Sequence, residues 1–330
     1  MNKNKNLWKK GVVVAAAAAM ITGVVPSVNA FAYGAYDVSQ STFKTDTDNS
    51  ADFQNWVSNV WQGGEGAFSG TDQVALTPGS DANDLNFGWY SESKGIPAVM
   101  IWKVGAKGAA EVFTGTASDI SAANWQGKTY TASNKVHIEN YFAENTKYCY
   151  QYTNDYKEDG TSVWSEQYTY TTQSTDQFSV ILTGDPQVGA SKGQPQGEGK
   201  LSAASGAANT AARNDGFAWD RTLDKALEQN PDLNFVISAG DQVNKTGKPK
   251  EEEYAAYLSA SALKGLPVAT TIGNHDSLNK DYSYHFNNPN PTNLGMTEAG
   301  GDYYYSYGSG LFIVLNTNNY NVAEHEQSIQ

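Results

Sequence analysis

The sequence predicts two folded parts in series: an all-β sandwich of immunoglobulin-like type over residues 71–173 and an α/β domain over residues 174–330. In the first part, short runs rich in Tyr, Val, Thr and Trp recur about every ten residues, which is typical of antiparallel strands. In the second part, β-type runs alternate with stretches of helical period. This alternation is typical of βαβ crossovers and predicts a parallel sheet.

Residues 1–30 carry the pattern of a secretory signal peptide. Four lysines precede an apolar stretch at 11–25, and small residues follow it, with cleavage expected after Ala30 or Ala32. A membrane anchor is the weaker reading, because the stretch is shorter than the ~20 residues that a spanning helix needs. The sequence therefore predicts a protein that is secreted or held at the cell surface, without an integral membrane segment after cleavage.

Charge and cysteine content narrow the functional classes. Removing residues 1–30 takes away four of the 22 basic residues and none of the 35 acidic ones, which leaves a net charge of −17. Binding of nucleic acid by a basic surface is thereby disfavoured. Cys149 is the only cysteine, so no intrachain disulfide forms, and its alternating strand pattern predicts a small buried residue.

The elements are expected in the following order. Residues 31–70 are polar and predict a leader that packs on the next domain. The runs expected as strands of the sandwich are 73–77, 85–90, 98–104, 111–115, 128–131, 136–140, 148–153 and 167–172. In the α/β domain, strands are expected at 178–183, 235–239, 267–272, 303–307 and 311–316, and helices at 217–230, 251–264 and from 322 onward. The aperiodic segment 186–216 predicts a border or lid of an active site, with disorder as the alternative.

Three short strings of polar residues follow the first three α/β strands. They are Gly184-Asp185-Pro186-Gln187, Gly240-Asp241-Gln242-Val243-Asn244 and Gly273-Asn274-His275-Asp276. Because the carboxyl ends of parallel strands meet at one edge of a sheet, we expect these strings to lie together. Asp185, Gln187, Asp241 and Asn274 offer oxygen donors that suit hard or borderline cations. Each of these residues taken alone is more simply a turn or cap residue, and only the ordered set predicts a metal site.

The three strings resemble the calcineurin-like metallophosphoesterase superfamily, whose blocks read DxH, GDxxN, GNHD or GNHE, a lone His, and GHxH. The likeness is closest to the purple acid phosphatase branch and its secreted bacterial relatives. Residues 178–330 carry the first three blocks in order, and residues 71–173 are similar to the fibronectin-type amino-terminal domain of that branch. Two positions depart from the pattern: Gln187 stands where the superfamily has His, and Asn244 where the purple enzymes have a Tyr ligand.

The resemblance implies a dinuclear centre of divalent or trivalent ions, namely Fe, Zn or Mn. It assigns Asp185 to the first ion, Asp241 to both ions and Asn274 to the second. Gln187 offers a neutral amide oxygen and is expected to be a weaker ligand than His. A hydroxide that bridges the ions is implied as the nucleophile on a small phosphate ester.

The resemblance also assigns residues to the substrate. His275 is expected to protonate or hydrogen-bond an oxygen of the substrate, with Asp276 holding its other ring nitrogen. Apart from the resemblance, His285 follows the third string closely enough to border the pocket, and it is expected together with Asn244 as a substrate-binding residue, the alternative for the Asn244 side chain being a bond to the backbone of a neighbouring loop.

Three functions stay open at this point. The leading prediction is a secreted phosphomonoesterase of the acid phosphatase kind, and a phosphodiesterase or nucleotidase with the same site is the first alternative. A non-catalytic surface or glycan-binding protein is the second, suggested by eight Trp and twenty Tyr that also suit a sandwich core. The lone His and GHxH blocks have no match after 316, so the chain is expected to be the amino-terminal part of a longer enzyme, inactive by itself.

Overall fold

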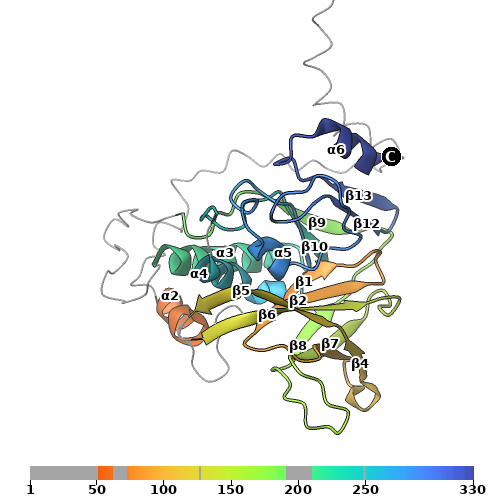
Figure 1. The fold of residues 1–330 in the computed structure, drawn as a ribbon. Coiled ribbons are helices and arrows are strands. Elements are labelled where there is room, and N and C mark those ends of the chain that lie inside the picture. Colours follow the sequence, from red (N-terminus) through yellow and green to blue (C-terminus); the bar gives the residue numbers. More distant parts are fainter. Residues whose placement is uncertain (1–50, 62–72, 126–127, 191–209, 248–249) are drawn as a thin grey trace, which may run out of the picture. The chain divides into compact units, whose positions relative to one another are not determined.

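The computed structural model describes residues 51–61, 73–125, 128–190, 210–247 and 250–330 (Figure 1). The predicted signal peptide, residues 1–30, and most of the predicted leader lie outside these ranges. The described part of the leader forms helix α2 (Ala51–Trp56) and the π-helical turn η3 (Val57–Trp61). The buried rings of Phe53 and Trp56 lie 5.1 and 5.7 Å from the ring of Phe217, so this segment packs on the α/β part of the chain.

Two antiparallel sheets build the all-β part. Their strands are β1 (Ala75–Pro78), β2 (Leu85–Ser91), β3 (Ala98–Lys103), β4 (Glu111–Thr114), β5 (Thr116–Trp125), β6 (Lys128–Ile138), β7 (Lys147–Thr153) and β8 (Tyr168–Thr171). One sheet has the order β1-β2-β6-β5 and the other β4-β3-β7-β8. The sheets share one apolar core, in which the rings of Phe87 and Tyr150 lie 5.4 Å apart. Cys149 is buried, as expected. Assignment of this part to the immunoglobulin or fibronectin type stays a prediction.

Strand β6 corrects the sequence analysis, which predicted two separate strands at 128–131 and 136–140. The polar residues between them continue the strand, because they pair with β2 on one side and with β5 on the other. Asn134 adds a side-chain hydrogen bond of 2.9 Å to Ser91 Oγ. Strand β5 was missed altogether. Its sequence is polar and its side chains are mostly exposed, so it shows little hydrophobic alternation, and pairing with β6 defines it.

The α/β part contains the predicted parallel sheet. Its strands are β9 (Ser179–Thr183), β10 (Leu233–Ser238) and β11 (Val268–Thr270), in the order β11-β10-β9. Side chains alternate along β10: Val236 packs with the helices, whereas Phe235 and Ile237 pack against the hairpin of β12 (Tyr303–Tyr307) and β13 (Gly310–Val314). The parallel sheet thus lies between a helical layer and an antiparallel hairpin.

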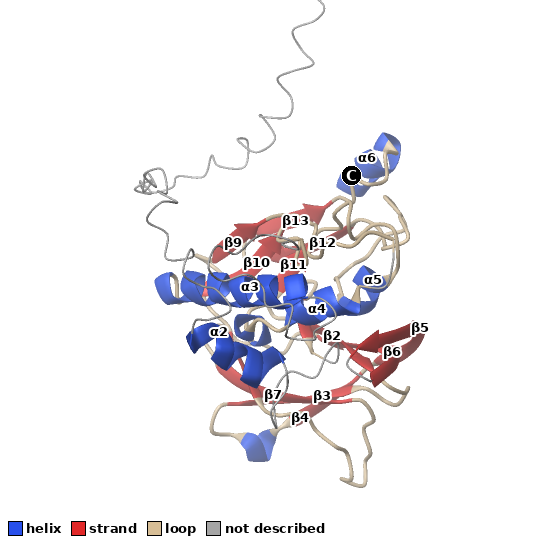
Figure 2. Cartoon of the chain, turned by 90° about the vertical axis from the view of Figure 1, so that its left-hand side faces the viewer, coloured by secondary structure: helices blue, strands red, loops and turns tan. Residues whose placement is uncertain are grey.

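The helices follow the predicted ones with three differences, the first being that the helix predicted at 217–230 already begins at Thr210, inside the segment 186–216 that was predicted to be aperiodic. They are α3 (Thr210–Gln229), α4 (Glu251–Leu258), α5 (Asp281–His285) and α6 (Val322–Ile329), with a 3-10 turn η7 (Ser261–Lys264) (Figure 2). The predicted helix 251–264 is interrupted after Leu258, because the backbone N–H of Ser261 donates to the carboxylate of Asp220 at 2.7 Å and starts η7 anew. Helix α5 was not predicted. No helix in the described ranges is long and apolar enough to cross a membrane.

A set of hydrogen bonds joins the all-β part to the segment around α5. Ser133 Oγ donates to the carbonyl of Tyr284 at 2.7 Å, and Lys135 Nζ donates to that of Phe286 at 2.8 Å. The side chain of Asn287 returns a bond of 3.1 Å to the carbonyl of Phe87. The segment that follows the third predicted site string is therefore held by β2 and β6.

Candidate active site

The three predicted strings leave the parallel sheet at the same level. Ser238 of β10 lies opposite Thr183 of β9 on one side and opposite Thr270 of β11 on the other. The strings begin within three residues of these positions, at 184, 240 and 273. The parallel register therefore places all three loops at one edge of the sheet, as the sequence predicted.

Backbone hydrogen bonds join the first loop to the second. The N–H of Asp185 donates to Gly240 O at 3.1 Å, and the N–H of Gln187 donates to Asp241 O at 2.9 Å. A residue further on, Val188 donates to Gln242 O at 3.2 Å. Each bond joins one carbonyl of the second loop to one amide of the first. The backbone positions of residues 185, 187 and 241 are therefore fixed relative to one another.

The third loop approaches the second so closely that two glycines are required. A Cβ on Gly240 would lie 2.8 Å from Gly273 Cα, and a Cβ on Gly273 would lie 2.0 Å from Asp241 Oδ1. Distances this short exclude any side chain at these positions. The contact lets the backbone N–H of His275 donate to Asp241 Oδ1 at 2.8 Å.

Three predicted metal ligands have a left-handed backbone conformation. The φ angles are 58° for Asp185, 37° for Gln187 and 51° for Asp241. Positive φ is uncommon for residues other than glycine and costs conformational free energy. Such residues persist where surrounding bonds over-determine them, and the inter-loop bonds above do so. This concentration of unusual backbone at two of the three strand ends, those of β9 and β10, points to a functional site.

The donors at this edge suit a cation that prefers oxygen. They are the carboxylates of Asp185 and Asp241 and the side-chain amides of Gln187 and Asn274; Asp185 and Asn274 are exposed and Asp241 is 9% exposed. Gln187 Nε2 lies 3.4 Å from Asp241 Oδ2. Nowhere in the described ranges do three or more His, Cys, Asp or Glu side chains gather as a complete metal site. The oxygen atoms of these four side chains are therefore the kind of ligand that hard cations prefer, but only two of the four side chains are charged.

His275 is half-buried and has a defined tautomer. Its Nδ1 makes a short hydrogen bond with the carbonyl oxygen of Asn244. A carbonyl only accepts, so Nδ1 carries a proton and Nε2 is the ring nitrogen left for other partners. Asn244 thus serves the site through its main chain: its N–H donates to Val188 O at 3.1 Å, and its C=O orients the histidine.

The expected contact between Asp276 and the ring of His275 is a wrong prediction. Asp276 is fully buried and accepts bonds from the N–H of Gly273 at 3.0 Å and from the hydroxyl of Tyr254 at 3.3 Å. Burial raises the pKa of Asp276 to about 6. Asp276 therefore stabilises the loop that carries His275, and the carbonyl of Asn244 makes the contact to the ring that was predicted for Asp276.

The expected position of His285 at the pocket border is also wrong. His285 is 1% exposed, and its ring stacks on Tyr90 of β2 at 4.1 Å and lies 4.4 Å from the ring of Tyr254. Its Nε2 lies 3.1 Å from Glu251 Oε2. The histidine is a core residue between α4 and the all-β part, and it has no access to a substrate.

The Glu251–His285 pair predicts a pH dependence of stability. Burial raises the pKa of Glu251 from 4.5 to about 8 and lowers the pKa of His285 to about 3, so a neutral carboxyl group donates to a neutral imidazole. Between pH 4.5 and 8 the folded protein keeps a proton on Glu251 that the unfolded chain releases. The contribution of Glu251 to the free energy of unfolding is therefore full below pH 4.5 and falls by about 1.4 kcal/mol per pH unit up to pH 8.

Denaturant unfolding of the protein and of Glu251→Gln across pH 4 to 9 checks this expectation. Glutamine replaces the titratable carboxyl by a neutral amide, so the difference between the two free energies of unfolding reports the Glu251–His285 pair. That difference should decline from pH 4.5 to pH 8 and level off above. A difference that stays constant with pH would contradict the buried neutral carboxyl.

Sequence analysis missed two buried charged residues of the site, Lys250 and Glu253. The run of charged residues at 250–253 reads as the solvated start of a helix. Both residues are nevertheless buried, at 0% and 1% exposure. The helical period was the available signal, because it places 250, 253 and 254 on the face that also carries the buried Tyr257.

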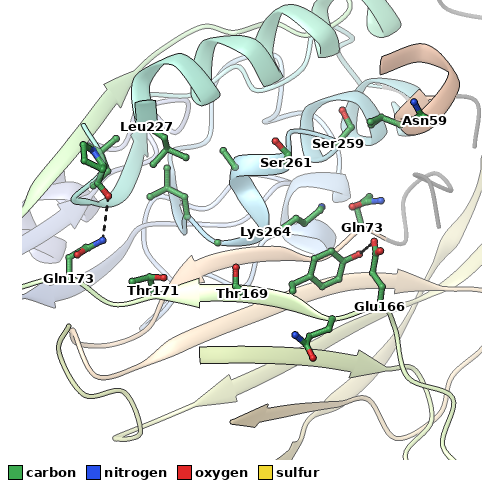
Figure 3. Close-up of a pocket in the computed structure, with 18 residues that line it drawn as sticks. Asn59, Gln73, Glu166, Thr169, Thr171, Gln173, Leu227, Ser259, Ser261 and Lys264 are labelled. Carbon is green, nitrogen blue, oxygen red and sulfur yellow. Dashed lines mark hydrogen bonds between the residues drawn. The ribbon is translucent and has the colours of Figure 1, made fainter. Parts of the chain in front are cut away.

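A cavity of about 670 Å³ lies away from this edge (Figure 3). It opens where β8 faces η7, and its lining includes Thr169, Leu233, Lys264 and Leu266. Leu233 is the first residue of β10, so the cavity lies at the amino end of the parallel strands. None of the predicted site residues lines it.

Comparisons with known proteins agree with the geometry of the strand ends. Residues 178–327 match the family model of calcineurin-like phosphoesterases. The solved structure of a purple acid phosphatase from yellow lupin (Lupinus luteus) seeds is similar in fold, with a TM-score of 0.51 and 15% sequence identity over 75% of this chain. The chain spans 45% of the length of that lupin chain. No match was found among curated protein sequences.

The matched range includes all three strand-end loops. It also includes strands β9 and β10, which precede the two aspartates with positive φ. It begins one residue before β9 and ends within α6. Over residues 178–327, this chain therefore matches the calcineurin-like phosphoesterase family.

Proposed function

We propose that the protein is a secreted phosphoesterase that hydrolyses small phosphate monoesters with two bound metal ions. The observation that carries the proposal is the convergence of three donor loops at one sheet edge, two of them with aspartates at positive φ. The family match of residues 178–327 supports phosphoester chemistry. Secretion rests on the pattern of residues 1–30, and the acidic charge argues against nucleic acid as a partner.

Four side chains are proposed as ligands. Asp185 and Gln187 would hold the first ion, Asn274 would hold the second, and Asp241 would contribute to both. Bound ions of the Fe, Zn or Mn type would supply positive charge for the phosphoryl group and a nucleophile at neutral pH. Asp241 keeps its orientation because Oδ1 already accepts the N–H of His275.

His275 is proposed as the acid or hydrogen-bond donor toward the substrate. Its Nδ1 is occupied by the carbonyl of Asn244, so only Nε2 is available for proton exchange with a phosphate or a leaving oxygen. A protonated Nε2 donates to the leaving group, and the fixed ring avoids the entropy cost of orienting it.

The proposal is tested by assaying the purified full-length protein with a panel of substrates. Aryl monoester, aryl diester and nucleotide substrates separate a phosphomonoesterase from a phosphodiesterase or nucleotidase. Metal analysis of the same sample separates both from a non-catalytic surface or glycan-binding protein. Turnover of the aryl monoester that disappears on chelation and returns with metal is the expected result, and absence of both metal and turnover would overturn the proposal.

We predict that iron-loaded protein lacks the visible tyrosinate-to-iron absorption of the purple enzymes. Asn244 has no phenolate, and the buried Tyr303 uses its hydroxyl to donate to Thr270 O at 2.7 Å. An absorption spectrum of the iron-loaded protein checks this expectation, with the Asn244→Tyr variant as the comparison. A strong visible band in the unmodified protein would show that another tyrosine reaches the metal.

A further inference from the structure

The amino-terminal turns of α4 contact both of the loops that hold His275. Lys250 Nζ donates to the backbone carbonyl of His275, and the hydroxyl of Tyr254 donates to Asp276 at 3.3 Å. Glu253, on the same face of the helix, contacts the second loop. These three residues are buried, and none belongs to a motif quoted above.

Glu253 makes the most specific of these contacts. Its Oε2 accepts the backbone N–H of Lys245 at 2.7 Å and, at 2.9 Å, the N–H of Asn244, which is shared with Val188 O. A Cβ on Gly189 would lie 2.5 Å from Glu253 Oε1, so the first loop closes over the same carboxylate. A buried carboxylate that accepts two amide N–H groups forms charge-assisted bonds, which are about twice as strong as neutral ones.

One peptide group connects Glu253 to His275. The N–H of Lys245 and the C=O of Asn244 belong to the same planar trans peptide, in which the two groups point in opposite directions. The N–H is bonded to Glu253 Oε2, and the C=O is bonded to His275 Nδ1. A negative charge at the N–H end polarises the peptide and makes its carbonyl oxygen a stronger acceptor.

We propose that Glu253 is a positioning residue that orients His275 and fixes its tautomer through the Asn244–Lys245 peptide. The carboxylate holds the peptide in place, and the polarised carbonyl keeps a proton on Nδ1, so that Nε2 is the ring nitrogen that gains and donates the second proton. Nε2 is thereby left free for the substrate. This inference rests on the proposed function for its catalytic consequence, and its structural content stands without it.

The structural content is tested by hydrogen exchange and by NMR of the histidine ring. In Glu253→Gln the amide at position 245 should exchange about 10- to 100-fold faster, because a charge-assisted bond is lost. The ¹⁵N shifts of His275 should show the Nδ1–H tautomer in the unmodified protein and a mixture of tautomers in the variant. Glu252→Gln, one residue away on α4 and half-buried, is the matched control and should change neither measurement.

The catalytic consequence is tested separately with an aryl phosphate. Glu253→Gln should lower kcat by about 10-fold or more and leave KM nearly unchanged, since second-sphere contacts typically contribute 10- to 100-fold. Unmodified protein without turnover would refute the proposed function and leave the exchange and NMR results standing as the test of positioning.

Three outcomes would overturn the positioning role. The first is amide exchange at position 245 that is equally fast in Glu252→Gln. The second is exchange in Glu253→Gln that rises uniformly over the whole protein. The third is an unchanged tautomer of His275 in Glu253→Gln. If Glu253→Gln does not fold, hydrogen exchange of the unmodified protein still tests the bond between Glu253 and the Lys245 amide. Its Lys245 amide should be protected at least about 10-fold relative to the Thr246 amide, although both residues are exposed, and equal exchange would refute the bond to Glu253.

Discussion

Replacing Asp241 by Asn is expected to abolish phosphoesterase activity, with a loss of at least about 10³-fold, while the fold is kept. The proposed role of this carboxylate is to contact two cations at once, and a neutral amide cannot balance their charge. Asparagine is isosteric and retains an oxygen that can accept the N–H of His275, which in the native protein donates to Oδ1 at 2.8 Å. The expected defect is therefore electrostatic, without disruption of the loop.

Metal analysis and turnover of the Asp241→Asn variant check this expectation together. At least one ion per chain should be lost along with the activity. Asp232→Asn is the matched control, because Asp232 is exposed in the turn before β10 and should tolerate the change. Full metal occupancy with undiminished turnover in Asp241→Asn would remove this residue from the site.

Replacing His275 by Ala is expected to keep the bound metal and to lower kcat by about 10²- to 10⁴-fold, the usual range for a positioned acid or base. The backbone N–H at this position, which bonds Asp241, is unaffected by the substitution. Only the imidazole and its bond to the carbonyl of Asn244 are lost.

The leaving group separates two roles of His275. If the imidazole donates a proton to the leaving oxygen, the loss should be small with 4-nitrophenyl phosphate and large with phenyl phosphate, whose leaving group is more basic. A uniform loss would show that His275 binds the phosphoryl oxygens and is not the acid. His137→Ala is the control, since His137 is exposed on β6 in the all-β part.

The sequence predicted the location of the candidate site because the signals for it are local. Each of β9, β10 and β11 is a short apolar run followed by Gly and a polar donor, and the helical stretches between them require parallel pairing. Parallel register then brings residues 185, 241 and 274 to one edge without further information. Local pattern and chain connectivity suffice for that inference.

Local sequence patterns did not predict the strands and helix ends that are determined by hydrogen bonds to residues far away in the sequence. The polar strand β5 exists because β6 pairs with it, and the middle of β6 is a strand because it pairs with both β2 and β5. Helix α4 ends early because Asp220, about forty residues away in the sequence, binds Ser261. In each case a hydrogen bond to a distant residue outweighs the local propensity.

The sequence by itself thus determined that a parallel sheet carries three donor loops at one edge, and which residues those loops present. Only the tertiary structure decided what each side chain touches. His285 became a core residue because Tyr90 and Tyr254 cover both faces of its ring, and Asp276 turned to Gly273 and Tyr254 and away from the catalytic histidine. Strand and helix periods are set by neighbours in the chain, whereas burial and hydrogen-bond partners are set by contacts between segments far apart in it.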